Sequence, residues 1–150
     1  MNHTEKALML FQEKYHCSQA VFAAFAPEYG ITEEQALKIG GCFGGGMCVG
    51  EMCGSVTGAL MVLGLKNGQC TTNDLKSRFH TNDLTNAMLE RFKLENGSYI
   101  CRDLLGYDLG IEEEGLIARE KGLFVTFCPR MVESAVKIVE ELIKEDESIS

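Results

Sequence analysis

Residues 40–50 constrain the fold most strongly, because six of these eleven residues are glycine. Each glycine costs roughly 1 kcal/mol relative to alanine in a helix interior, so a regular helix cannot continue through this segment. Two cysteines, Cys42 and Cys48, lie inside it. A backbone without side chains can approach their sulfur atoms, or a bound ion, closely. We therefore expect a Gly/Cys-rich loop between helices.

On both sides of this loop, apolar residues recur with helical spacing and not with strand-like alternation. Before the loop, helices are expected to begin at Thr4 and Cys17, and a capping-box pattern over 32–35 predicts a third. After it, helices are expected over 51–63, 73–97, 98–105, 111–121 and from Pro129 onward. The sequence therefore predicts an all-α fold, a compact bundle of about six or seven helices forming one domain over 1–150.

Two of these segments carry more specific expectations. The segment 51–63 is apolar on nearly all sides and contains small residues, which is typical of a buried helix that its neighbours approach closely. A strand stays open there, because short apolar runs are ambiguous. In the helix over 73–97, the apolar positions jump by five residues from Phe79 to Leu84. This jump predicts a kink or break near Thr81.

Composition excludes several classes of protein. The net charge of −8 makes nucleic acid an unexpected partner, and no apolar run approaches the roughly 18 residues that cross a bilayer. The polar N-terminus does not resemble a signal peptide, so we expect a cytoplasmic protein. Thiols stay reduced in the cytoplasm. The seven cysteines therefore indicate metal binding or redox chemistry more than a disulfide framework.

Most of the cysteines occupy the same kind of position. They fall within the first turn of an expected helix: Cys17, Cys53, Cys101 and Cys128. The thiolate is both the nucleophile and the metal ligand, and the free N–H groups of a helix start stabilise it. Burial has the opposite effect on a thiol pKa. We expect at least one activated thiol, with Cys42 and Cys53 favoured because they lie beside the loop.

No two cysteines are spaced as C-x-x-C. This absence excludes the thioredoxin motif and the usual zinc-ribbon and ferredoxin spacings. Exchange or ligation would need cysteines gathered from different helices. We expect Cys42 and Cys53 to share one neighbourhood and Cys17 or Cys101 to approach them.

Three other features have simpler interpretations. The run Gly44 to Gly46 could cradle a phosphate, but no Lys-Ser/Thr follows it, so close packing or access to a sulfur atom is favoured. His16 is expected on the surface. Glu51 is expected at a helix start, where the dipole favours a carboxylate, and a catalytic or ligand role for it is a minority interpretation.

The chain resembles the redox-active protein family that is named for its C_GCAxxG_C_C cysteine pattern. The matching segments are 16–21, 41–47, 50–60 and 92–106, together with Cys128. They span most of the chain, and the block from Gly41-Cys42 to Cys53-Gly54 is the specific part. Within the family, the activity is itself inferred largely from the cysteines.

The resemblance implies which residues define the site. The defining cysteines would be Cys17, Cys42, Cys53 and Cys101, framed by Gly41 and Gly46, with Cys128, Cys48 and Glu51 as additional candidates. Two positions depart from the pattern. Phe43 replaces the alanine of the family name, and Cys48 stands where glycine is usual.

Three functions stay open. The first is a cysteine-based redox protein, acting by thiol–disulfide exchange or electron transfer as a thiol-dependent oxidoreductase. The second is a metal-binding protein that holds zinc or an iron–sulfur cluster on Cys17, Cys42, Cys53 and Cys101. The third is a structural protein with inert thiols. The redox partner and substrate are undetermined at this point, and a homo-oligomer is compatible with the sequence.

Overall fold

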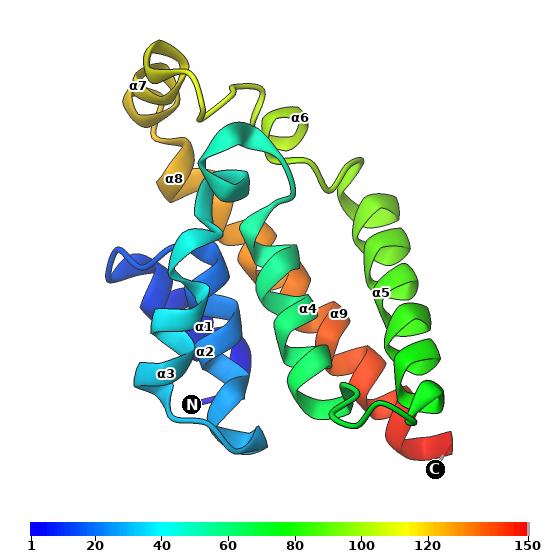
Figure 1. Cartoon of the computed structure of the whole chain (residues 1–150). Coiled ribbons are helices and arrows are strands. Elements are labelled where there is room, and N and C mark those ends of the chain that lie inside the picture. Colours follow the sequence, from blue (N-terminus) through cyan, green and yellow to red (C-terminus); the bar gives the residue numbers. More distant parts are fainter. Residues whose placement is uncertain (150) are drawn as a thin grey trace.

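The computed structural model describes residues 1–149, and these residues are almost entirely helical (Figure 1). The helices are α1 (His3–Gln12), α2 (Cys17–Phe25), α3 (Glu33–Ile39), α4 (Gly54–Asn67), α5 (Leu75–Asn96), α6 (Cys101–Leu105), α7 (Glu112–Glu120), α8 (Leu123–Thr126) and α9 (Cys128–Ile149). Shorter helical turns are η1 (Ala26–Tyr29), η2 (Gly40–Cys42) and η3 (Gly46–Gly50). Within residues 1–149 the extended pairing is a single bridge between Met52 and Ile100. The all-α prediction is confirmed.

One hydrophobic core joins α1, α2, α4, α5 and α9. The helix α2 is buried on nearly every side, with Ser18 and residues 20–25 all inaccessible or nearly so. Its neighbour α4 turns two glycines toward it. A methyl group at Gly58 would lie 2.6 Å from the Ser18 carbonyl oxygen. The prediction that small residues allow close helix approach is confirmed, because only glycine lets these two backbones come so near.

Three helices of the core, α2, α4 and α9, run in the same direction, and this direction determines where their cysteines lie. In Figure 1, α2, α4 and α9 all begin at the end of the molecule where α6 lies, and they run toward the end where both termini lie. The N-terminal ends of α2, α4, α6 and α9 therefore lie together at one end of the bundle. We call this the cysteine end, because each of these four helices starts at or beside a cysteine.

Several predicted boundaries need correction. The first helix is capped by Asn2 and not by Thr4, because the Asn2 side chain accepts the Glu5 N–H. The buried helix starts at Gly54 and not at Glu51. The last helix starts at Cys128, one residue before Pro129, and the short helix α8 was not expected.

The expected break in α5 is also absent, since this helix runs without interruption from Leu75 to Asn96. The jump in apolar spacing has another cause. Phe79 is 61% exposed and does not belong to the buried face, which begins with Leu84. The capping box at Thr32 and the start of α5 at the Asp74 cap are confirmed.

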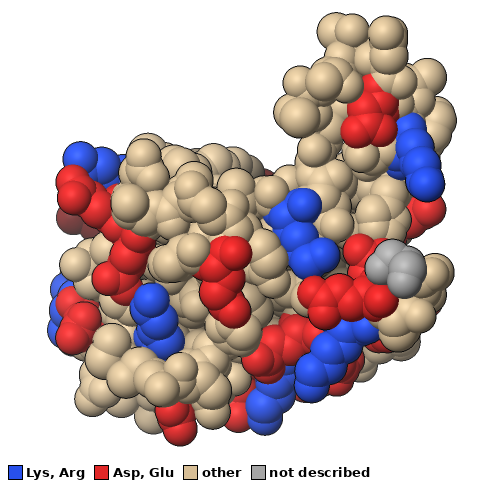
Figure 2. Space-filling model, turned by 90° about the horizontal axis from the view of Figure 1, so that it is seen from below, with Lys and Arg blue, Asp and Glu red and all other residues tan. Residues whose placement is uncertain are grey.

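The surface away from the cysteine end carries mixed charge. On the face shown in Figure 2, acidic and basic side chains are interspersed. Ion pairs between α5 and α9 contribute to this pattern, including Arg91 with Glu145 at 2.6 Å and His80 with Asp146 at 2.8 Å. Among the described residues, every helix is too short or too polar to span a bilayer.

Candidate functional site

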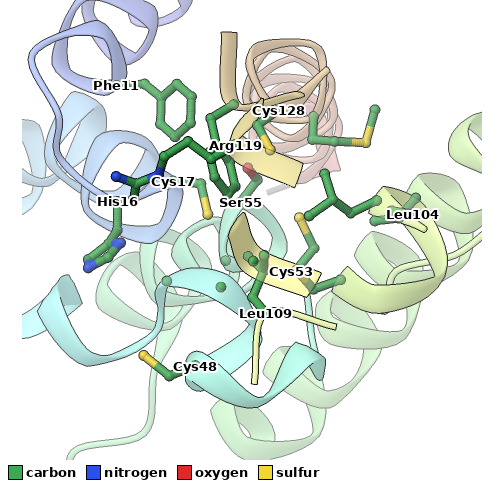
Figure 3. Close-up of a pocket in the computed structure, with 18 of the residues that line it drawn as sticks. Phe11, His16, Cys17, Cys48, Cys53, Ser55, Leu104, Leu109, Arg119 and Cys128 are labelled. Carbon is green, nitrogen blue, oxygen red and sulfur yellow. The ribbon is translucent and has the colours of Figure 1, made fainter. Parts of the chain in front are cut away.

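Five of the seven cysteines line one pocket at the cysteine end (Figure 3). They are Cys17, Cys48, Cys53, Cys101 and Cys128. The pocket has a volume of about 590 Å³, and its walls include the apolar side chains Phe11, Leu104, Leu105, Leu109, Phe124 and Met131. A pocket of this size with mostly apolar walls and few polar groups is typical of a small-molecule site.

Four of these residues form what we call the four-cysteine cluster: Cys17, Cys53, Cys101 and Cys128. Cys17, Cys101 and Cys128 are the first residues of α2, α6 and α9, and Cys53 is the N-terminal cap of α4. The prediction that these cysteines stand at helix starts is confirmed. The parallel arrangement of α2, α4 and α9 then explains why Cys17, Cys53 and Cys128 face one cavity, and α6 adds Cys101.

A short backbone pairing places two of the four side by side. The Cys53 N–H donates to the Tyr99 carbonyl at 2.8 Å, and the Cys101 N–H donates to the Glu51 carbonyl at 2.5 Å. These two bonds flank the bridge between Met52 and Ile100. The segments that precede α4 and α6 are therefore held together, and each delivers its cysteine to the pocket.

The same pairing corrects the interpretation of Glu51. This residue precedes the helix and does not line the pocket. Its carboxylate accepts a hydrogen bond from Arg102 at 2.7 Å, and Arg102 also donates to the Gly50 carbonyl. Glu51 therefore contributes to the connection between the loop and α6, and its carboxylate is engaged away from the thiols.

The glycine-rich loop adopts left-handed backbone at several positions. Gly45, Gly46 and Gly50 have φ values of 65°, 64° and 71°, and the non-glycine residues Met47 and Cys48 have φ values of 58° and 62°. Such values strain residues that carry a Cβ, and strain of this kind gathers at functional sites. Cys48 is exposed and lines the pocket. The family resemblance implies that glycine is usual at this position. A glycine would adopt the same φ without strain.

Backbone atoms lie close to the sulfur of Cys17. A methyl group at Gly54 would overlap it, so the backbone that follows Cys53 lies directly against this sulfur. The backbone N–H groups of Gly45 and Ser18 act to lower the pKa of this thiol, against the larger effect of burial. The glycine run thus provides access to a sulfur atom, which is the interpretation favoured over a phosphate cradle.

Ser55 adds a buried hydroxyl beside this sulfur. The hydroxyl acts to lower the pKa of the Cys17 thiol. Within the described residues, however, the Ser55 oxygen makes no hydrogen bond of regular geometry, although the residue is fully buried. A buried polar atom without a partner is rare and calls for an explanation. Figure 3 shows it inside the ring of cysteines.

Burial dominates the protonation of the cluster. It raises the pKa of Cys53 to about 12, and the negative charge of a Cys17 thiolate is the next cause. Burial followed by the same charge also raises the pKa of Cys101 to about 12 and that of Cys128. The pKa of Cys17 is raised by burial as well. The expectation of an activated Cys53 is therefore wrong, because desolvation outweighs the helix start.

Cys42 was expected to join Cys53, but it is exposed and does not line the pocket. The two glycines expected to frame the site pack against other residues. Gly41 lies near the Gln19 side chain, and Gly46 lies near the Glu51 backbone. Cys70 is exposed elsewhere. His16 is exposed as expected, although it lines the pocket. Sequence reasoning missed Ser55 and Arg119, whose side chains carried no motif.

The four-cysteine cluster offers the donor types of a metal centre. Thiolates from four helix starts are suitable ligands for zinc or an iron–sulfur cluster. Among residues 1–149, however, no three His, Cys, Asp or Glu side chains are placed so that they could hold one ion. The residue types fit a metal, whereas their placement in the described part of the chain does not form a site for a single ion.

The fold and the pocket together define a class: small helical proteins that gather cysteines from several helix starts around one apolar cavity. A family model, described as "Putative redox-active protein (C_GCAxxG_C_C)", matches residues 15–142. The chain belongs to this family, and the resemblance noted from the sequence is confirmed. The family description supports a redox-related role. Neither the curated proteins nor the solved structures contain a match to the chain.

Proposed function

We propose that this protein is a thiol–disulfide redox protein whose reactive groups are the four-cysteine cluster. The observation that carries the proposal is the convergence of four thiols from four helix starts on one pocket, Cys53 buried and the other three partly buried. A protein with inert thiols would have no need to collect them around a cavity that a small molecule can enter. The reaction class is exchange between a dithiol and a disulfide.

Cys17 is the proposed nucleophile. It stands at the centre of the cluster, since its charge affects the pKa of each of the other three thiols. Burial raises its pKa, but the neighbouring N–H groups of Gly45 and Ser18 and the Ser55 hydroxyl act to lower it, which favours a thiolate. Cys101 and Cys128 have no such donors among the causes that shift their pKa.

Cys53 is the proposed resolving residue, because the Cys53–Gly54 backbone lies against the Cys17 sulfur. The Cys17 thiolate attacks one sulfur of a substrate disulfide, forms a mixed disulfide and releases the first substrate thiolate. The Cys53 thiolate then attacks the Cys17 sulfur and releases the second. The two protein thiols lose two electrons and two protons, and the substrate disulfide gains them to become two thiols.

The test is single-turnover oxidation of the reduced, metal-free protein by a small disulfide, followed by mass-spectrometric mapping. We expect a bond between Cys17 and Cys53 and loss of the reaction in C17S. The C53S variant should stop at the mixed disulfide on Cys17. C70S and C42S are matched controls, because both residues are exposed and neither lines the pocket. If C42S abolishes the reaction and C53S does not, the proposal is wrong.

A metal centre is the second candidate, and the raised pKa values favour it. No cationic side chain is among the causes that shift the pKa values of Cys53 and Cys101, and a metal cation would supply the charge that stabilises their thiolates. The ligands would be Cys17, Cys53, Cys101 and Cys128. Zinc would supply a structural centre, and an iron–sulfur cluster would supply one-electron transfer.

Anaerobic purification separates these candidates. Colourless protein without zinc or iron, which then forms a reversible disulfide, supports exchange. Visible absorbance with stoichiometric iron, or stoichiometric zinc, supports the metal centre. Metal-free protein whose thiols neither exchange nor oxidise would leave them structural. A cytoplasmic location, which the sequence predicts, would keep the resting cluster reduced.

A further inference from the structure

The pocket contains more than its cysteines. Two cationic side chains line it, Lys14 after α1 and Arg119 near the end of α7, against a single carboxylate, Glu112. This local excess of positive charge stands out in a protein with a net charge of −8. Within residues 1–149, Arg119 has no carboxylate partner at ion-pair distance, unlike Arg91 and Arg102. Figure 3 shows Arg119 among the side chains around the cavity, on the side of Phe11, His16 and Cys17.

The depth of the sulfur atoms limits what can react with them. Cys53 is only 7% exposed, and Cys17 is enclosed by Gly54, Gly45 and Ser55. The disulfide of a folded protein could not reach these sulfurs without opening the bundle. A molecule of a few carbon atoms could reach them, because about 590 Å³ is well within the range of small-ligand pockets.

The inner end of the pocket also carries an unpartnered group. The Ser55 hydroxyl is fully buried and lacks a regular hydrogen bond, beside the sulfur that we propose as the nucleophile. Such a group is expected where an incoming atom, or the charge that develops on a sulfur, completes its hydrogen bonding. The pocket therefore has a cationic group without a partner at one side and a polar hydroxyl without a partner beside the thiols.

We propose that this pocket takes a small organic disulfide that bears a carboxylate, with the carboxylate against Arg119 and the disulfide sulfur against Cys17. This inference rests on the proposed exchange function and names its substrate class. The apolar walls hold the carbon chain of the ligand. An arginine guanidinium is the residue best suited to a planar carboxylate, which it binds through two parallel hydrogen bonds. The exchange step is the one given above, with the released products being two small acidic thiols.

Three symmetrical disulfides of similar size test the inference: dithiodipropionate, hydroxyethyl disulfide and cystamine, which are acidic, neutral and basic. The rate of protein oxidation by each is divided by its rate with dithiothreitol, which removes differences in intrinsic reactivity. We expect the acidic disulfide to be about tenfold faster than the neutral one, since a charge-assisted hydrogen bond contributes about that factor. The basic disulfide should be slowest.

R119Q should remove this preference, so that the normalised rate of the acidic disulfide falls to that of the neutral one measured with the same variant. K121Q is the matched control, because it removes the same charge two residues further along, from a side chain that lies over Tyr107 and not in the pocket. R119K should restore part of the preference. Arg119 is exposed, so we expect these variants to fold. Circular dichroism checks this.

The outcomes separate the inference from the function on which it rests. Equal normalised rates for the three disulfides, or an R119Q variant that keeps the preference, overturn the inference while exchange itself stands. A faster reaction with a protein disulfide also overturns it. If no disulfide oxidises the protein, the exchange function fails. Calorimetry would then measure the binding of dithiodipropionate to the C17S variant. Binding that R119Q weakens would still support an acid-binding pocket. Absence of binding would overturn both the exchange function and the acid-binding pocket.

Discussion

The two ends of the α2–α4–α9 bundle are built differently. At the end where the termini lie, the chain uses conventional stabilising contacts, such as the capped start of α1 and the Lys66–Glu147 ion pair. At the cysteine end it places left-handed Met47 and Cys48 and an unpartnered Ser55 hydroxyl. The same three helices support both. The comparison indicates that the packed helices stabilise the fold. The strained backbone and buried polar groups of the cysteine end lower that stability, and they hold the thiols in an unfavourable environment.

The largest effect should come from the core itself. Phe25 is fully buried at the end of α2, so Phe25→Ala should lower the free energy of unfolding by roughly 3–5 kcal/mol. Denaturant unfolding measures this loss. Phe79→Ala is the control, since Phe79 is exposed on α5, and it should change stability by about 0.5 kcal/mol or less. A similar loss in both variants would mean that the core does not carry the stability.

The next test moves to the contact between α4 and the Cys17 sulfur. Gly54→Ala should destabilise by roughly 1–3 kcal/mol, because its methyl group would overlap that sulfur, and it should displace Cys17 and slow exchange. Gly64→Ala lies in the same helix with open space around it. It should stabilise the protein by roughly 0.5–1 kcal/mol through helix propensity alone. Thermal unfolding and alkylation of Cys17 report the two effects, and equal behaviour of the two variants would contradict the close contact.

Stability should also fall at alkaline pH because of the cluster. The pKa of Cys53 is about 12 in the folded protein against an ordinary value of 9.0. A raised pKa stabilises the folded state below pH 9, and this contribution is lost as the pH rises from 9 toward 12, because the unfolded thiol ionises first. The slope is about 1.4 kcal/mol per pH unit for one thiol.

Denaturant unfolding of the reduced, metal-free protein between pH 8 and about pH 10.5 measures this slope. C53S should reduce it, and C70S should leave it unchanged, since Cys70 is exposed and outside the pocket. Alkylation of Cys53 should likewise accelerate about tenfold per pH unit across this range, in proportion to its thiolate fraction. A pH-independent stability would show that Cys53 is already ionised or bound.

The helical bundle could be predicted from the sequence better than the cysteine end. Periodicity and caps located α2, α3 and α5, and the helix starts at the cysteines to within three residues, because local backbone preferences decide them. The start of α4 was missed by three residues, since the backbone pairing with Tyr99 and Cys101 is a long-range contact that propensity does not encode.

The site was harder to predict than the helices. Cys42 was favoured because it lies in the loop and fits the family pattern, yet which cysteines share a pocket depends on the parallel directions of α2, α4 and α9. Cys128 entered the cluster for that reason. The direction of the thiol pKa shifts could not be predicted either. A helix start lowers a thiol pKa and desolvation raises it, and which effect is larger depends on how deeply the sulfur is buried.

The smallest expected effect concerns Cys48, where the comparison between the two ends is sharpest. Its φ of 62° strains any residue with a Cβ, so Cys48→Gly should stabilise the protein by about 1 kcal/mol despite the greater freedom of glycine in the unfolded chain. Cys48→Ala removes the same thiol and keeps the strain, so it should leave stability nearly unchanged. Thermal unfolding of the two variants separates backbone from sulfur. If Ala stabilises as much as Gly, the strain lies in the side chain, and the left-handed loop is not what makes this end of the bundle less stable than the other.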